Sequence, residues 1–179
     1  MVKLIAIIFV LTLMAVLIYA ATRPDAFRIE RSIRIMAPPQ KIHPLINDFR
    51  AMQTWSAWEK VDPNAKSTHS GAASGKGAAM AWEGNSEVGA GRMEITESLP
   101  EKITLRMEFI KPFAAINTTE FTLRADGDAT TVTQAMFGPS PFISKLMGLV
   151  FSMDKMVGGK FEESLAALKV VAEMKALEK

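Results

Sequence analysis

The 179-residue chain contains no cysteine and only two histidines. Without cysteine the chain has no disulfide, no thiolate ligand for a metal and no cysteine nucleophile. Histidine is the commonest metal ligand and general base, and the two copies, His43 and His69, fall in different predicted elements. We therefore expect no metal site and no cofactor.

The sequence also lacks an excess of either charge. Lysine and arginine total 21, aspartate and glutamate total 19, and the net charge is +2. Residues 1–25 hold two of the cations and one of the anions, which leaves 19 and 18 for residues 26–179. A protein that grips a phosphate backbone needs a basic field. We expect no nucleic-acid partner.

One long apolar run stands apart from the rest. Leu4 to Ala21 contains no charge, and 18 residues of helix span about 27 Å, close to the roughly 30 Å hydrocarbon core of a bilayer. A cleaved signal peptide is an alternative, because Lys3 supplies a positive start, but bulky Ile18 and Tyr19 stand where cleavage needs small residues. A buried core helix is a third possibility, although the run has no polar face. We expect a single-pass membrane anchor through residues 4–21.

Signals for the side of the membrane conflict. More positive charges follow the apolar run than precede it, which favours a cytoplasmic domain. The charges that follow are Arg23, Arg28, Arg31 and Arg34. The last three fall in a predicted strand, however, and large domains translocate largely regardless of charge. We favour an extracytoplasmic domain.

After a linker that ends at residue 25, apolar periodicity indicates strands. Phe27–Ile35 alternates apolar and polar side chains, the period of a half-buried strand. A short helix from Pro39 follows, which Pro44 shortens or kinks, and a further helical turn covers Phe49–Met52. Turn residues then separate six more predicted strands: Lys66–Ser70, Gly77–Glu83, Gly91–Leu99, Lys102–Ile110, Asn117–Ala125 and Thr130–Phe137.

Two helices are predicted to follow the strands. Ser140 and Pro141 form an N-cap and first-turn pair, so we expect a helix over residues 141–151. Asp154 is expected to cap a longer helix over residues 155–177.

The longer helix carries one apolar stripe, which should face a core. Its members recur at spacings of four, four, three and four: Val157, Phe161, Leu165, Leu168 and Ala172. The glycine pair Gly158-Gly159 is unfavourable in a helix and predicts close packing or a bend.

This order of elements predicts an α+β fold. A curved antiparallel sheet of about seven strands would wrap around the long C-terminal helix, which is the helix-grip arrangement. We expect this domain over residues 26–179, after an anchor and linker in residues 1–25.

Several short motifs between residues 26 and 175 carry a family resemblance. They are Ala37-Pro38-Pro39-Gln40-Lys41-Ile42, Ile46-Asn47-Asp48-Phe49, Trp55-Ser56-Ala57-Trp58-Glu59, Gly75-Lys76-Gly77, Trp82-Glu83-Gly84-Asn85, Gly89-Ala90-Gly91 and Met93-Glu94-Ile95. In these the sequence resembles the SRPBCC superfamily, the START-like group that includes birch-pollen-allergen-like proteins and the polyketide cyclase/dehydrase family. Such proteins usually have Trp-Ser-Pro-Trp where this chain has Ala57, which predicts a less rigid loop. The resemblance implies the helix-grip fold, but the superfamily spans binders, cyclases and chaperone regulators.

On each predicted strand one side is apolar and the other is charged. The charged side should form the convex, solvated face; it includes Glu94, Arg106, Glu108, Glu120 and Arg124. The inner side is rich in methionine, whose flexible thioether suits an adaptable apolar pocket, although ordinary core filling gives the same pattern. Two amides, Asn117 and Gln134, share the inner side and need hydrogen-bond partners from a ligand, water or backbone.

We take eleven side chains as candidate ligand-binding residues: Trp55, Trp58, Met80, Trp82, Met93, Leu105, Met107, Phe121, Gln134, Met136 and Phe161. Trp82 shares its side of a strand with Met80 and should form part of the wall. Trp55 and Trp58 lie in a polar segment, which suits a mouth or lid. Stapling that loop to the sheet is the alternative.

The sequence contains no catalytic motif, and its catalytic residues are unknown. Asp48 and Glu59 flank the tryptophan loop and could act as acid and base, but surface contacts or helix ends also explain carboxylates there. We expect a membrane-anchored domain that binds a small hydrophobic or amphipathic, lipid-like molecule. The alternatives are an enzyme of the cyclase/dehydrase type and a protein-interaction module.

Overall fold

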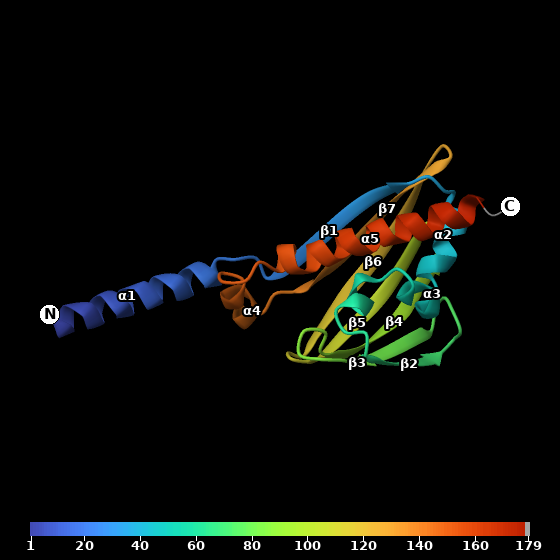
Figure 1. Ribbon diagram of the computed structural model, residues 1–179. Coiled ribbons are helices and arrows are strands. Elements are labelled where there is room, and N and C mark those ends of the chain that lie inside the picture. Colours follow the sequence, from blue (N-terminus) through green and yellow to red (C-terminus); the bar gives the residue numbers. More distant parts are fainter. Residues whose placement is uncertain (178–179) are drawn as a thin grey trace.

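A computed structural model describes residues 1–177 and shows one sheet gripping a long helix (Figure 1). The helices are α1 (Val2–Ala21), α2 (Pro39–Ile46), α3 (Phe49–Gln53), the 3-10 turn η1 (Ala57–Lys60), α4 (Phe142–Met147) and α5 (Met153–Leu177). The strands are β1 (Ala26–Ile35), β2 (Lys66–Gly71), β3 (Ala78–Glu83), β4 (Ala90–Leu99), β5 (Lys102–Lys111), β6 (Ala115–Asp126) and β7 (Ala129–Pro139). All seven predicted strands are present, and their ends differ from the predictions by at most two residues.

The strands form one antiparallel sheet in the order β1-β7-β6-β5-β4-β3-β2. The meander from β2 to β7 uses tight turns such as the one at Gly127, whose positive φ of 61° suits glycine. β1 returns to pair with the last strand, so that Ile29 lies opposite Met136 and Ile33 opposite Val132. β1 and β2 are therefore the sheet edges, and α5 lies along β1 on the concave side (Figure 1). This is the helix-grip fold that the sequence predicts.

The start and end of α4 differ from the prediction. Pro141 and not Ser140 occupies the cap position, and the Ser140 backbone N–H donates to the Asp25 carbonyl at 2.7 Å. The helix ends at Met147 rather than near residue 151. Gly148 follows Met147 at the C-cap. Glycine is unfavourable inside a helix because it loses more conformational entropy on folding than other residues, so helices often end at it.

The cap of α5 also differs from the prediction. Asp154 lies inside the first turn, and its carboxylate accepts hydrogen bonds from Arg31 on β1 instead of from the helix end. The Ser152 hydroxyl accepts from the backbone N–H of Lys155 at 3.3 Å and takes the capping role. Asp154 therefore forms an ion pair with Arg31, which is distant in sequence, and does not cap the helix.

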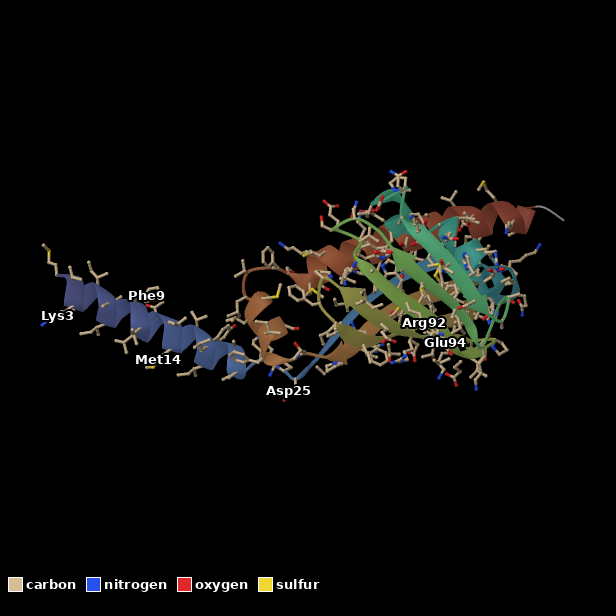
Figure 2. All side chains as sticks on the ribbon, turned by 90° about the horizontal axis from the view of Figure 1, so that it is seen from below. Lys3, Phe9, Met14, Asp25, Arg92 and Glu94 are labelled. Carbon is tan, nitrogen blue, oxygen red and sulfur yellow. The ribbon has the colours of Figure 1, made fainter. Side chains whose placement is uncertain are left out.

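The convex face of the sheet carries charges, as predicted. Arg92 and Glu94 point outward from β4 (Figure 2), with their side chains paired at 3.0 Å. Arg106 and Glu108 on β5 form an equivalent pair at 3.0 Å. Pairs exposed in this way contribute at most about 1 kcal/mol each, so their main effect is to keep this face in water.

α1 projects away from the sheet (Figure 1). Its mean hydropathy over 18 residues is 2.9, and only Ala20 is buried. This exposure contradicts the alternative of a buried core helix. The helix is long and apolar enough to cross a membrane, a property that an anchor shares with a signal sequence.

Candidate functional site

The concave side of the sheet divides into two regions. In the first, which we call the filled half, α2, α3, the tryptophan loop and the C-terminal part of α5 pack onto the sheet. Ile42 and Ile46 from α2, Ile103 from β5 and Leu168 from α5 are completely buried there. The apolar spacing of α5 produces this contact, because Leu165, Leu168 and Ala172 return to one face of the helix. A region packed this closely has the density of an ordinary core.

Trp55 belongs to the filled half. Its ring is 3% exposed, meets Phe121 edge to face with centroids 6.1 Å apart, and donates from Nε1 to the Leu45 carbonyl at 2.9 Å. The prediction that Trp55 forms a mouth or lid is therefore wrong. Its polar neighbours in sequence misled that prediction, because they face outward while the ring turns into the core.

The second region, the open half, lies toward the end of the sheet that carries α1. Its buried members are Ile29, Met136 and Phe161. Phe27, Phe109 and Val157 pack against them but are only partly buried. Within residues 1–177 no helix equivalent to α2 covers this region, and Phe27, Phe109 and Val157 remain partly accessible.

Trp82 forms the wall of the open half on the side of β3. Its ring meets Phe109 edge to face with centroids 5.8 Å apart, and its Nε1 donates to the Val88 carbonyl at 3.3 Å. Gly91 on β4 leaves room for the ring, because a Cβ there would lie 2.4 Å from it. Because Gly91 has no side chain, the Trp82 ring can pack closely against β4 at this position.

Two amides interrupt this apolar surface. Asn117 on β6 and Gln134 on β7 are each 8% exposed, and neither Asn117 Oδ1 nor Gln134 Oε1 has a hydrogen-bond partner among the described residues. Asn117 lies against Gly138, and Gln134 lies four residues earlier on the same strand. At about 3.3 Å per residue the two positions are about 13 Å apart along the sheet. Unpartnered buried oxygens are rare because each costs about 1–3 kcal/mol.

Arg31 lies on β1 opposite Gln134, at the edge of the open half. Its guanidinium contacts Asp154 at 3.0 Å and Glu162 at 2.5 Å, both on α5. The hydrogen bond to Asp154, followed by that to Glu162, raises the pKa of Arg31, and Arg31 in turn lowers the pKa of Asp154. Gly158 explains the close approach, because a Cβ there would lie 2.3 Å from Arg31 Nη2. The predicted tight packing at the glycine pair is therefore present at Gly158.

The eleven candidate residues distribute over both regions. Met80, Leu105 and Phe121 join Trp55 in the filled half, with Met93 packed at its margin. Met136 and Phe161 line the open half, Trp82 contacts its Phe109, and Gln134 is one of the two unpartnered amides. Met107 is partly buried opposite Asn117. Trp58 is 37% exposed on η1 and remains a lid prediction.

Four members of the open half were not among the candidates: Phe27, Ile29, Phe109 and Val157. The sequence held a signal for two of them: alternation along β5 places Phe109 on the same side as Met107, and Val157 belongs to the apolar stripe of α5. The missing information was the position of β1 beside β7, which brings Phe27 to this end of the sheet.

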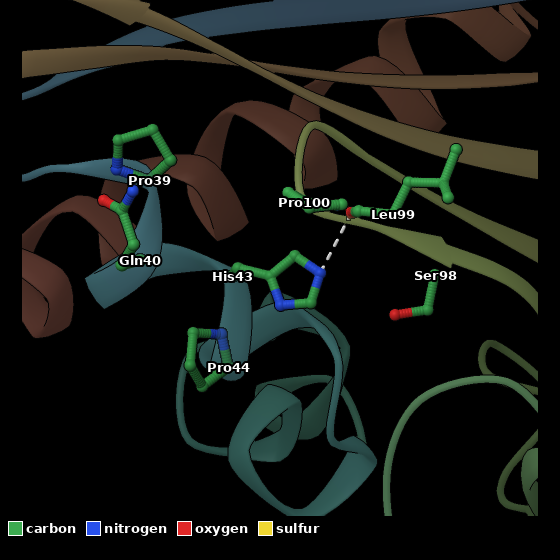
Figure 3. Close-up of a pocket in the computed structure, with 7 residues that line it drawn as sticks. All are labelled: Pro39, Gln40, His43, Pro44, Ser98, Leu99 and Pro100. Atoms are coloured by element: carbon green, nitrogen blue, oxygen red, sulfur yellow. Dashed lines mark hydrogen bonds between the residues drawn. The ribbon is translucent and has the colours of Figure 1, made fainter.

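A surface hollow of about 350 Å³ lies elsewhere, between α2 and the β4–β5 turn (Figure 3). His43, Pro44 and Leu99 are among its lining residues, and His43 Nε2 lies 3.1 Å from the Leu99 carbonyl. His69 lies on β2, so the two histidines come from separate parts of the fold. The hollow borders the filled half and contains none of the eleven candidates.

The fold and the lined concave face define a class, the helix-grip proteins. Within it, residues 26–173 match the model of the family described as polyketide cyclase / dehydrase and lipid transport, and the chain belongs to that family. A comparison with curated proteins finds no match.

Solved structures confirm the fold. Protein MLL2253 from Mesorhizobium loti is 14% identical with a TM-score of 0.60, covering 84% of this chain and 100% of its own. The Aha1 dimer from Colwellia psychrerythraea is 18% identical with a TM-score of 0.56 over 83% and 97% of the two chains. Ara h 8.0201 is 9% identical with a TM-score of 0.54 over 86% and 99%. At these identities the likeness concerns the fold alone.

Proposed function

We propose that the chain is a membrane-anchored domain that binds a small, elongated and largely apolar molecule in the open half. The anchor in this proposal is residues 4–21, the binding domain is residues 26–179, and the domain faces the extracytoplasmic side. The family description, which includes lipid transport, agrees with an apolar ligand.

The observation that carries the proposal is the pair of unpartnered amide oxygens on an apolar wall. Asn117 and Gln134 would each form a hydrogen bond to a neutral polar group of the ligand, such as a hydroxyl or an amide. Their offset of about 13 Å favours a long molecule with polar groups at separate points. The charged side chain that we place beside this region is Arg31, and its charge is already matched by Asp154 and Glu162, so a neutral ligand fits better than a carboxylate.

The apolar body of the ligand would contact four side chains: Trp82, Met107, Met136 and Phe161. Their aromatic and thioether groups adapt to different chain shapes, so the site would select by length and polarity more than by exact outline. No acid–base pair is proposed here, because the Asp48 carboxylate already caps α3 by accepting from the Arg50 backbone N–H at 2.8 Å. The cyclase alternative is left as an outcome of the experiment.

The test is native mass spectrometry of the full-length protein purified from its own membrane. We expect a bound apolar molecule, and we expect Gln134→Leu to reduce its occupancy. Gln53→Leu is the matched control, since it removes the same amide from α3, outside the open half. Equal occupancy in both variants, or a protein that carries no molecule, would contradict the proposal. Recovery of a chemically altered molecule after incubation would instead favour an enzyme.

A further inference from the structure

The end of the domain that carries α1 exposes an apolar surface that the proposed ligand site does not use. We call it the α4 surface, and its side chains come from α4 and the segment after it. Its members are between 38% and 78% exposed: Phe142, Ile143, Met147, Val150 and Phe151. Soluble surfaces rarely gather this many large apolar side chains without a partner.

The α4 surface is also nearly free of charge. Lys145 is the one charged residue between positions 141 and 153. Its side chain is only 7% exposed, and its Nζ lies 2.5 Å from Asp25 Oδ1 in the linker. The cation therefore points back toward the junction with α1 and leaves the outer surface apolar.

α4 lies beside the end of α1 that meets the domain (Figure 1). Ala20 in the last turn of α1 is completely buried, and α1 and α4 contact one another. The linker that follows is four residues long, and its last member, Asp25, accepts a hydrogen bond from the backbone N–H of Ser140 just before α4. Figure 1 shows α4 at this junction, and Figure 2 labels Asp25 there. α4 therefore cannot lie far from any membrane that α1 crosses.

The last turn of α1 also marks where that membrane would end. Tyr19 lies near the end of the apolar helix, and the Arg23 guanidinium is 5.9 Å from its ring centroid. Aromatic residues and terminal cations occupy the boundary between hydrocarbon and headgroups. The headgroup region extends about 5–8 Å beyond the hydrocarbon, and α4 contacts α1 and lies at this end of it (Figure 1).

We propose that the α4 surface lies in the headgroup region of the bilayer that α1 spans, next to the open half of the grip. This inference rests on the membrane anchoring in the proposed function. Apolar side chains on an otherwise uncharged segment insert shallowly into such a boundary. The open half lies at the same end of the sheet, so an apolar ligand would pass between bilayer and domain with little exposure to water.

The absence of cysteine allows a direct test. Single-cysteine variants of the full-length chain are labelled with a polarity-sensitive fluorophore and reconstituted into phosphatidylcholine vesicles, with or without nitroxide-labelled lipid as the quencher. Val150→Cys probes the α4 surface. Met174→Cys is the matched control, because Met174 is an equally apolar residue, 55% exposed, near the distant end of α5. Met14→Cys reports on the anchor itself.

We expect the lipid quencher to reduce fluorescence at positions 14 and 150 and to leave position 174 unchanged. Quenching at 14 with none at 150 would overturn the α4 proposal alone. No quenching at 14 would overturn the anchor and with it the proposed function. A label at 150 that is shielded from aqueous iodide yet untouched by the lipid quencher would show that a second copy or another protein covers the surface, which also overturns the proposal.

Discussion

The two halves of the grip are made from the same sheet and the same helix but differ in what covers them. The filled half receives α2, α3 and the ring of Trp55, and its large side chains are buried. The open half receives only the first part of α5, and its polar amides lack partners. In a protein with few internal voids this contrast indicates a division of labour. The filled half has the packing of a core that stabilises the fold, and in the proposed function the open half is the part that binds the ligand.

The sharpest way to test this division is to remove a core side chain from the filled half. Leu165 is 1% exposed on α5, and Leu165→Ala should lower the free energy of unfolding by about 2–5 kcal/mol, since the cavity adds to the lost burial. Glu163→Ala on the exposed face of α5 is the control, with a change near zero. Denaturant unfolding of the full chain measures both. Similar losses at the two positions would mean that α5 does not bury this stripe.

A polar group should have opposite effects in the two halves. Val132 is fully buried in the filled half, and Val132→Thr would place an unpartnered hydroxyl there at a cost of about 1–3 kcal/mol. Gln134→Leu, two residues along β7, removes an oxygen that is already unpartnered, so stability should stay level or rise by up to about 1 kcal/mol. Thermal unfolding of the ligand-free protein compares them. A clear loss for Gln134→Leu would show that the amide is satisfied in solution.

The glycine pair at the start of α5 gives a smaller contrast. Nothing lies within 4 Å of a Cβ on Gly159, so Gly159→Ala should stabilise the helix by about 0.5–1 kcal/mol. Gly158→Ala should gain less or lose stability, because its methyl displaces Arg31 from Asp154 and Glu162. Melting temperatures of the two variants and the unmodified protein, measured under the same conditions, show which substitution is more stabilising. An equal gain at both positions would show that Arg31 can move aside without loss.

The smallest expected effect concerns pH. Arg31 lowers the pKa of Asp154, so the folded state binds fewer protons at this carboxylate than the unfolded chain does. The resulting stability is present above the ordinary pKa of 3.8 and is lost as the pH falls below it. Protection factors for amide hydrogen exchange, which are corrected for the intrinsic effect of pH, should therefore fall in the first turns of α5 under acid conditions before the Leu165 region is affected. Asp154→Asn should remove this difference, and unchanged acid sensitivity in that variant would argue against the role of the pair.

Local patterns were enough to predict the elements and the fold. Alternation along β4 to β7 separated inner from outer side chains, and the spacing of Phe161, Leu165 and Leu168 identified the face of α5 that is buried. These patterns are reliable because a strand or helix has a fixed period, and burial of one face makes that period visible in the sequence. The apolar length of residues 4–21 is equally visible without a structure.

The division of the concave face into two halves depended on tertiary contacts that no short stretch of sequence contains. Trp55 looked like a lid residue until the chain brought Leu45 and Phe121 to it. Asp154 looked like a helix cap until Arg31 arrived from a strand more than a hundred residues earlier. The sequence alone therefore determined the periods of the elements and the side of each that turns inward. Only the tertiary structure decided which inward side chains find partners, because partnership depends on packing between residues that are distant in the chain.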